Sequence, residues 1–300
     1  AADRPDLWFT SHLSHQAPDW TGPAVAKALN ISYVAAEASY AQKQAKGRWA
    51  EGLEATRLAL GQAGAVFALS RIDEEGLRAH VQPDRLHRLA PFIDTNQFLG
   101  ARSACPPDLK ADIEALEGPI LLAIGMMRPG DKLASYQILG QALEALMDLP
   151  WSLLVVGDGP ARSDIEAALP TGRTHFAGAL SSDVIPAVIA KTDLMVWPAI
   201  NEAYGMALLE AQAGGVPVIA GASGGVPEII ADGHTGLLTR PGDPLAFAEA
   251  VRALLVDPAK RRSMASAAQQ NVRKNHDISS VAAAMNEILP PLARSVATSA

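Results

Sequence analysis

The sequence has only one cysteine, Cys105, among its 300 residues. A single cysteine excludes a disulfide framework and any cysteine metal cluster, and it fits a reducing compartment. No apolar run approaches the roughly 20 residues that a membrane-spanning helix needs. The first residues, AADRPDLWF, lack the basic and then apolar profile of a signal peptide. We therefore expect a cytoplasmic location.

The sequence also has fewer basic than acidic residues. The chain has 25 lysines and arginines against 32 aspartates and glutamates, which gives a formal net charge of −7. This balance disfavours nucleic acid or an anionic membrane as a partner over the whole surface, although it is compatible with a local basic pocket. The length and the hydrophobic share of 49% are enough for about two domains of ~150 residues each.

Short apolar runs and helical patterns alternate along the whole chain. The strand-like runs are residues 6–12, 32–36, 65–70, 120–126, 152–157, 174–178, 194–198, 217–220 and 236–239. Helix-compatible segments lie between them, for example 135–149, 182–192 and 244–257. Strands that alternate with helices are typical of parallel sheets with helices on both faces, so we predict an α/β fold.

A change of composition at FLGARSACPPDLKADIEALEGPI (98–120) indicates a linker between two domains. We predict a first domain over residues 1–105 and a second over residues 106–300. The first has only three or four strand-like runs and no glycine-rich turn after its first strand, so we expect it to lack its beginning. The last helical segment, 278–293, is compatible with packing on either domain.

The stretch NEAYGMALLEAQAGGVPVIA (201–220) places glutamates on either side of an apolar segment. We predict a helix from near Gly205 to Ala213, with Glu202 in the loop before it and Glu210 on its second turn. The first amides of a helix have no intrahelical partner and suit phosphate or hydroxyl oxygens. Carboxylates beside them would accept hydrogen bonds from the hydroxyls of a sugar and of a ribose. The alternative is structural, with Glu202 as a capping acid and Glu210 on a solvated face.

A second pattern, AIGMMRPGDKLASY (123–136), follows the first strand of the second domain. Arg128 and Lys132 bracket a strand-to-helix turn, where two cations would neutralise a diphosphate. The alternative is a solvated basic loop in which Asp131 pairs with a neighbour.

Two glycine-containing turns complete the set. VVGDGP (155–160) runs from a strand into a turn that lets the backbone come close to a ligand, and we expect Gly157 and Gly159 to line the ligand site. GASGGVPEIIADGHTGLL (221–238) shapes a loop before a short helix, and ordinary turn chemistry explains it equally well. All four patterns follow predicted strand ends on one side of one sheet. Together they predict an anion-binding crevice for a diphosphate sugar.

The order of these motifs resembles the retaining GT-B glycosyltransferases of the Glu-x7-Glu group (family 4-like, glycosyl transferases group 1). The resemblance covers residues 118–290 well and extends more weakly through the first domain. It implies a GT-B type fold, with two Rossmann-like domains built on parallel sheets and an incomplete N-terminal one. It also implies an enzyme that moves a glycosyl unit from a nucleotide-sugar to an acceptor hydroxyl, with retention of the anomeric configuration.

The same resemblance implies roles for residues of the second domain. Glu202 would hydrogen-bond the hydroxyls of the donor sugar, and Glu210 would accept from the ribose hydroxyls. Arg128 and Lys132 would hold the diphosphate and stabilise the charge left on it as the glycosidic bond breaks. The amides expected to line the sugar and the phosphate are those of Gly205, Met206 and Ala207. Members of the family typically need no metal, so neither a metal nor another cofactor is expected.

The chain departs from the family pattern at the arginine. That arginine usually follows the strand glycine directly, with four residues between it and the lysine. Here Met126 occupies its position, so the loop must be reshaped for Arg128 to reach the same phosphate.

A second departure concerns the acceptor side. The family carries a histidine in a Glu-His-Ser-like run, whereas this chain has Glu37 followed by alanine and serine. We assign Glu37 and His12 to the acceptor side, with His15 as the alternative histidine. The acceptor stays open between a glycan, a lipid-linked molecule and a small molecule. Nucleic acid is not expected, and the resemblance leaves room for peripheral membrane contact through the missing part of the first domain.

Other functions compete with glycosyl transfer. The chain could be a non-catalytic nucleotide-sugar-binding module or an inactive fragment, or an epimerase or phosphorylase-like enzyme on the same two-domain plan. An epimerase should show acid–base residues against the sugar ring, and a phosphorylase a lysine for a cofactor aldehyde. Neither signature stands out in this sequence.

Overall fold

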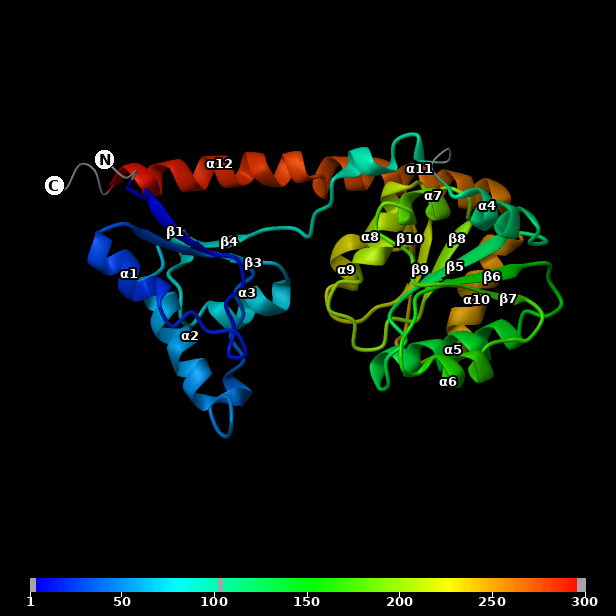
Figure 1. Ribbon diagram of the computed structural model, residues 1–300, viewed down its shortest axis with the longest axis horizontal. Helices are drawn as coiled ribbons and strands as arrows, with labels where there is room; N and C mark the ends of the chain where they lie inside the picture. The colour runs from blue at the N-terminus through cyan, green and yellow to red at the C-terminus, as the bar shows by residue number, and fades with distance from the viewer. Residues whose placement is uncertain (1–3, 102–104, 296–300) are drawn as a thin grey trace. The chain divides into compact units, whose positions relative to one another are not determined.

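The structure is a computed structural model that describes residues 4–101 and 105–295. It divides into two compact units, which we call unit 1 and unit 2 (Figure 1). Unit 1 contains the residues up to Pro91 and those from Ser279 onward, and unit 2 runs from Phe92 to Ile278. Each unit is built on one parallel sheet, which confirms the predicted α/β class.

The boundary between the units follows Pro91, upstream of the 105/106 boundary expected from composition. The intervening segment packs on the core of unit 2, with Ile93 against that core and Cys105 buried in it. Ile93 also exchanges two backbone hydrogen bonds with residues 276–278. The change of composition therefore marks the start of helix α4 (Pro107–Glu114) rather than the boundary between the units.

Unit 1 has a four-stranded parallel sheet in the order β1-β2-β3-β4. Its strands are β1 (Leu7–Thr10), β2 (Ser32–Ala35), β3 (Ala65–Ala68) and β4 (Leu86–Arg88). Its connecting helices are α1 (Gly22–Leu29), α2 (Ala50–Gln62) and α3 (Arg71–Leu77), with short 3-10 turns at Gln42–Gln44 and Pro83–Arg85. Three of the strands coincide with predicted runs. The fourth, with the sequence LHR, has no apolar run that could reveal it.

Helix α12 (Ile278–Ser295) packs on unit 1. Val281, Met285 and Ile288 on this helix lie against Val34 and Phe67 of the sheet. These positions follow the three- and four-residue spacing of one helix face, so the helix covers the sheet with an apolar stripe. The sequence left the choice of unit open, and this packing decides it.

Unit 2 has a six-stranded parallel sheet in the order β10-β9-β8-β5-β6-β7. Its strands are β5 (Ile120–Ile124), β6 (Ser152–Val156), β7 (Thr174–Gly178), β8 (Leu194–Trp197), β9 (Val218–Gly221) and β10 (Gly236–Thr239). All six coincide with predicted runs. Strands β6, β8 and β9 are buried along their whole length, as expected of parallel strands that are covered on both faces.

Helices cover both faces of this sheet (Figure 1). The helices on one side are α5 (Asp131–Glu144), α6 (Arg162–Ala168) and α10 (Pro244–Leu255). Those on the other side are α7 (Ile185–Ile189), α8 (Met206–Ala213) and α11 (Pro258–Asn275). The short helix α9 (Val226–Ile229) follows β9, and a 3-10 turn spans Thr95–Phe98.

The strand order creates a switch point between β5 and β8. From β5 the chain proceeds outward through β6 and β7, and it then crosses to the other side of β5 to form β8. The connections after β5 and β8 therefore diverge to opposite faces and leave a crevice at the carboxyl ends of these strands. Such switch points are where open parallel sheets bind ligands.

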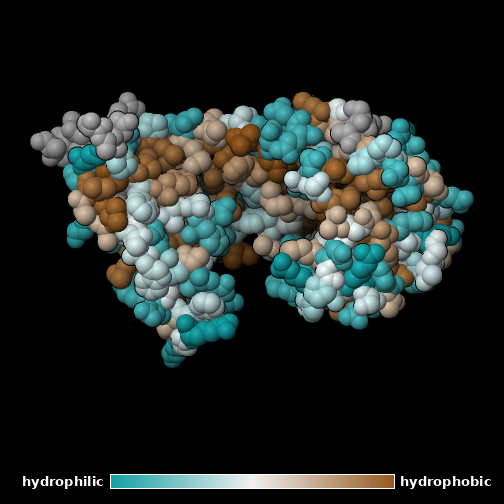
Figure 2. Space-filling view, viewed as in Figure 1, coloured by the Kyte–Doolittle hydropathy of each residue, from teal (hydrophilic) through white to brown (hydrophobic). Residues whose placement is uncertain are grey.

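Figure 2 shows a largely hydrophilic surface over α5 and α6 of unit 2. Of the helices in the described ranges 4–101 and 105–295, none is both long enough and apolar enough to cross a membrane.

Candidate functional site

A cavity of about 460 Å³ opens at the switch point of unit 2. It is formed by the segments that follow β5, β6, β7 and β8 and by the start of α8. Its lining residues are Ile124, Gly125, Met126, Lys132, Val156, Gly157, Asp158, Ala179, Leu180, Ser182, Ile185, Trp197, Glu202, Gly205, Met206, Ala207 and Leu208. The predicted crevice at the strand ends therefore exists, and most of its wall is apolar.

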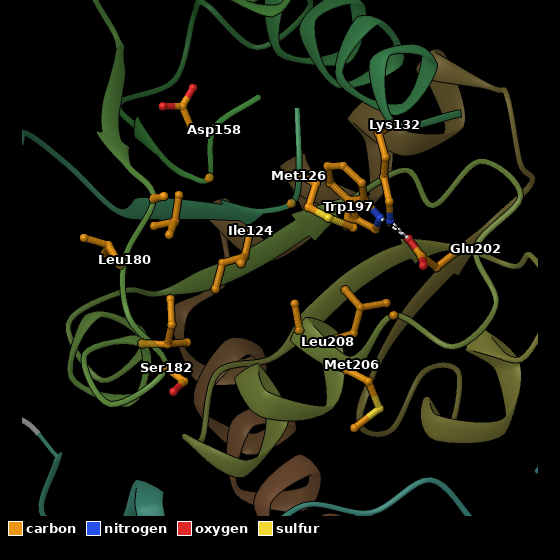
Figure 3. A pocket seen from close by; sticks show the side chains of 17 residues that line it. Ile124, Met126, Lys132, Asp158, Leu180, Ser182, Trp197, Glu202, Met206 and Leu208 are labelled. Carbon is orange, nitrogen blue, oxygen red and sulfur yellow. Dashed lines mark hydrogen bonds and ion pairs between the residues drawn. The ribbon is translucent and has the colours of Figure 1, made fainter. Parts of the chain in front are cut away.

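Glu202 and Lys132 meet in this cavity (Figure 3). Lys132 Nζ lies 2.5 Å from Glu202 Oε2, and the two side chains are 27% and 14% exposed. The indole Nε1–H of Trp197 donates to the same oxygen at 3.0 Å. The lysine lies on the first turn of α5 and the glutamate in the loop after β8, so the ion pair spans the switch point.

The loop that carries Glu202 has an uncommon backbone conformation. Ala199 and Asn201 have φ values of 55° and 49°, in the left-handed region that is unfavourable for most residues with a side chain. The side chain of Asn201 donates to Asp131 at the start of α5 at 2.9 Å. The N–H of Glu202 donates to Ser223 Oγ at 3.2 Å. These bonds fasten the loop to its neighbours and direct the carboxylate into the cavity.

Helix α8 begins at the cavity wall. Gly205 precedes the helix with a φ of 71°, and a Cβ at this position would lie 2.8 Å from the side chain of Leu208. Glycine is therefore required for this turn. Gly205, Met206 and Ala207 all line the cavity. Their amides lie at the positive end of the helix, which suits an anion.

Glu210 lies on the second turn of α8 but does not line the cavity of the described residues. Its side chain is partly buried, and no described residue forms a hydrogen bond with it. Burial raises the pKa of the Glu210 carboxyl above its ordinary value, because the charged form loses solvation. The side chain is thus a half-buried acceptor with free hydrogen-bonding capacity.

The two predicted glycines after β6 serve different purposes. Gly157 lines the cavity, and its N–H donates to the Gly178 carbonyl at 2.8 Å. Gly159 does not line the cavity and lies instead against the backbone of Met127, where a Cβ would collide with the carbonyl oxygen. Gly159 therefore supports the loop after β5, and the intervening Asp158 is among the residues that line the cavity (Figure 3).

Arg128 is exposed and is not among the lining residues, whereas Met126 lines the cavity with 49% of its surface exposed. Among the described lining residues, Lys132 is the one basic side chain. The described cavity wall thus has one cation, Lys132, beside Asp158 and Glu202.

The residues assigned to the acceptor side lie in unit 1. His12 and Glu37 follow β1 and β2, and His12 Nδ1 lies 3.3 Å from Glu37 Oε2, with both side chains at least half exposed. His15 instead has both ring nitrogens buried without a hydrogen-bond partner among the described residues. Its ring packs edge-on against Trp49 at 5.8 Å. The fold therefore brings His12 and Glu37 together and holds His15 in an apolar contact.

Several lining residues were not predicted from the sequence. Trp197 lies within the predicted run 194–198 and is the last residue of β8, and its place at a strand end is the signal that could have indicated it. Leu180 and Ser182 follow β7 without any motif. Only the position of β7 beside β6 brings them to the cavity wall.

The sequence matches characterised glycosyltransferases. Residues 118–257 match the family described as Glycosyl transferases group 1. The chain is 32% identical over 225 residues to the alpha-D-kanosaminyltransferase of Streptomyces kanamyceticus. The aligned residues cover 73% of this chain and 56% of that protein. The chain is 31% identical over 215 residues to the D-inositol 3-phosphate glycosyltransferase of Salinispora tropica, over 65% and 44% of the two chains. The chain thus spans about half the length of the curated relatives it matches.

The fold matches solved structures as well. The Anabaena protein HepE in complex with UDP and glucose superimposes with a TM-score of 0.73, over 95% of this chain and 77% of that one. The sequence identity is 19%, so the likeness establishes the fold alone. With the two parallel sheets, it confirms the predicted GT-B type architecture.

Proposed function

We propose, on the match of residues 118–257 to the family Glycosyl transferases group 1, that the chain transfers a glycosyl unit from a nucleotide-sugar to an acceptor hydroxyl. One observation carries the proposal: Lys132, Glu202 and the start of α8 converge in one cavity at the switch point of the sheet. A cation and free helix amides suit a diphosphate. A carboxylate beside them suits the hydroxyls of the attached sugar.

In this proposal the diphosphate binds where Lys132 and the first amides of α8 meet. The leaving nucleoside diphosphate carries more negative charge than it did in the donor, so a fixed cation and fixed dipoles stabilise the transition state more than the ground state. Arg128 would have to fold over from outside the cavity to add a second cation. The apolar wall around Leu180 and Ile185 gives a nucleobase a surface on which to pack.

The two glutamates have separate parts in this proposal. Glu202 accepts hydrogen bonds from hydroxyls of the transferred sugar, and Glu210 accepts from the ribose. The half-buried, unpartnered carboxylate of Glu210 supports its assignment, because a ligand hydroxyl would restore the hydrogen bonding that burial removes.

Retention of the anomeric configuration and independence from metal are also proposed. The spacing of Glu202 and Glu210 resembles that of the retaining group, which supports retention. For the leaving group, the cation and the amides described above are the groups that would neutralise the diphosphate. The anomer of the product, read by proton NMR before mutarotation, tests the first point.

The acceptor is proposed to be a glycan, a lipid-linked molecule or a small molecule that presents a hydroxyl. His12 and Glu37 are the candidates to contact it, because both are exposed at strand carboxyl ends of unit 1. A histidine paired with a carboxylate can accept a proton from a hydroxyl.

A binding module without turnover is the second candidate. One observation favours it: all the described residues that line the cavity belong to unit 2, so unit 2 alone forms the described cavity wall. To separate the two, we would measure the release of nucleoside diphosphate from a panel of nucleotide-sugars, together with thermal stabilisation by the same compounds. Release above that of a Lys132→Ala variant supports the transferase. Stabilisation without release supports the binding module. The absence of both release and stabilisation contradicts both candidate functions.

A further inference from the structure

Three contacts join Trp197, Lys132 and Glu202 into one cluster. The indole Nε1–H donates to Glu202 Oε2 at 3.0 Å, and Lys132 Nζ reaches the same oxygen at 2.5 Å. Lys132 Nζ also lies 5.2 Å from the centroid of the indole ring. Both donors end on Oε2, and no described residue donates to Oε1. The tryptophan thus contacts the acid with its edge and the base with its face (Figure 3).

The indole is rigidly held by its surroundings. Trp197 is 2% exposed at the end of β8. Tyr136 packs edge-on against its ring at a centroid distance of 5.0 Å. Gly125 lies so close that a Cβ there would be 3.0 Å from the ring atom Cη2. A side chain fixed in this way presents its N–H in one direction, which is what a preorganised site requires.

We propose that Trp197 is the positioning residue that keeps Glu202 in place while Lys132 exchanges partners. The inference rests on the proposed function. While Lys132 and Glu202 are paired with each other they neutralise each other, so neither is free for a donor molecule. When a diphosphate binds, Lys132 turns to the phosphate and Glu202 loses its cation.

The indole N–H then becomes essential. A carboxylate that is only 14% exposed needs a remaining hydrogen-bond donor, because burial of an unpaired charge is unfavourable. Trp197 supplies that donor at Oε2, and Oε1 stays available for a sugar hydroxyl. The ring face also stays in reach of the ammonium group, so Lys132 can move without leaving a favourable contact.

The first test compares two equivalent deletions. Trp197→Phe keeps an aromatic ring beside Lys132 and removes the N–H. Trp151→Phe is the matched control, because Trp151 is also 2% exposed and its indole donates to the Leu146 carbonyl at 2.8 Å, outside the cavity. We expect Trp197→Phe to lower kcat roughly 10-fold or more, the range of a lost hydrogen bond to a charged group, with less than a threefold change in the donor KM. A kcat within twofold of that of Trp151→Phe would overturn the proposal.

The second test needs no turnover. The indole ¹⁵N–¹H spectrum has one signal for each of the five tryptophans, and the signal lost in Trp197→Phe identifies Trp197. Glu202→Gln should shift this signal upfield, since an amide oxygen is a weaker acceptor than a carboxylate, and it should leave the Trp151 signal in place. Uridine or guanosine diphosphate should also shift the Trp197 signal as Lys132 departs.

The outcomes of the second test separate the two proposals. A Trp197 signal that does not respond to Glu202→Gln overturns the positioning role, whatever the nucleotides do. A signal that responds to Glu202→Gln while no indole signal responds to either nucleotide contradicts the proposed function instead.

Discussion

Replacing Lys132 with alanine should weaken the binding of a nucleoside diphosphate to unit 2. A charge-assisted hydrogen bond to phosphate contributes about 1.5–3 kcal/mol. Part of this gain is offset in the wild type, because Lys132 is already paired with Glu202 and that pair must open first. Both side chains keep some exposure, and Glu202 retains the hydrogen bond from Trp197, so we take the loss of the pair as about 1 kcal/mol. The net change is then about 0.5–2 kcal/mol, or roughly a 2- to 30-fold increase in Kd.

The same competition gives an opposite expectation for Glu202→Gln. This variant removes the carboxylate that pairs with Lys132, so the ammonium group is free for the phosphate. The Kd of the nucleoside diphosphate should therefore fall, by up to roughly fivefold for a pair of about 1 kcal/mol. In the double variant no ammonium group is left to release, so Glu202→Gln should not improve binding in the Lys132→Ala background.

Isothermal titration calorimetry with uridine and guanosine diphosphates, at low and at high salt, measures these changes. Lys191→Ala is the matched control, since it breaks another ion pair of unit 2, with Glu114 at 3.1 Å, outside the cavity. Lys132→Ala with the same Kd as Lys191→Ala would remove the lysine from the site. Weaker binding by Glu202→Gln than by the wild type would refute the competition between the carboxylate and the phosphate.

Three further predictions concern the glutamates and metal. Glu202→Gln should mostly lower kcat, because the sugar changes charge in the transition state. Glu210→Gln should mostly raise the donor KM, because its contacts to the ribose are the same in the ground state and the transition state. Steady-state kinetics on a reactive donor measures both, and two variants that behave like the wild type would contradict these expectations. Burial raises the pKa of the Glu210 carboxyl in the folded state, so as the pH rises this carboxyl loses its proton first in the unfolded state. Ionisation then favours the unfolded state, and the free energy of unfolding of the wild type falls as the pH rises through the folded-state pKa. Denaturant unfolding from acid to neutral pH should show Glu210→Gln gaining stability over the wild type with increasing pH, and a constant difference would argue against this. Turnover should also survive a chelator, and loss of activity that added Mg²⁺ or Mn²⁺ restores would disprove the proposed neutralisation by protein groups alone.

Much of the fold could be predicted because the parallel strands of unit 2 are short runs of buried aliphatic residues. Runs such as ILLAI and SLLVV stand out against their helical flanks. Strand β4 could not be found in this way, since its three residues include His87 and Arg88. Local composition could not locate the boundary between the units either. The segment that contains Ile93 belongs to unit 2 because it packs on the core of that unit.

The residues of the candidate site could be predicted from the sequence, but the contacts between them could not. Glu202, Lys132 and the start of α8 each follow a strand, so their approach to one sheet edge followed from the sequence. The positions of Gly159 and Arg128 did not follow from the sequence. Loop packing places Gly159 against the backbone of Met127 and leaves Arg128 exposed.

The sequence by itself determined the alternation of strands and helices, the helix that begins after Gly205 and the residue types at the strand ends. These depend on local periodicity and turn chemistry, which neighbouring residues decide. Only the tertiary structure decided that Lys132 and Glu202, 70 positions apart, form an ion pair, and that Trp197 donates to the same oxygen. The ion pair forms because β8 pairs with β5, which brings the loop after β8 beside the start of α5. The indole contact joins residues only five positions apart, and the fold of the loop after β8 turns Glu202 back to Trp197. The order of strands in a sheet is set by contacts between distant segments, and no local pattern contains it.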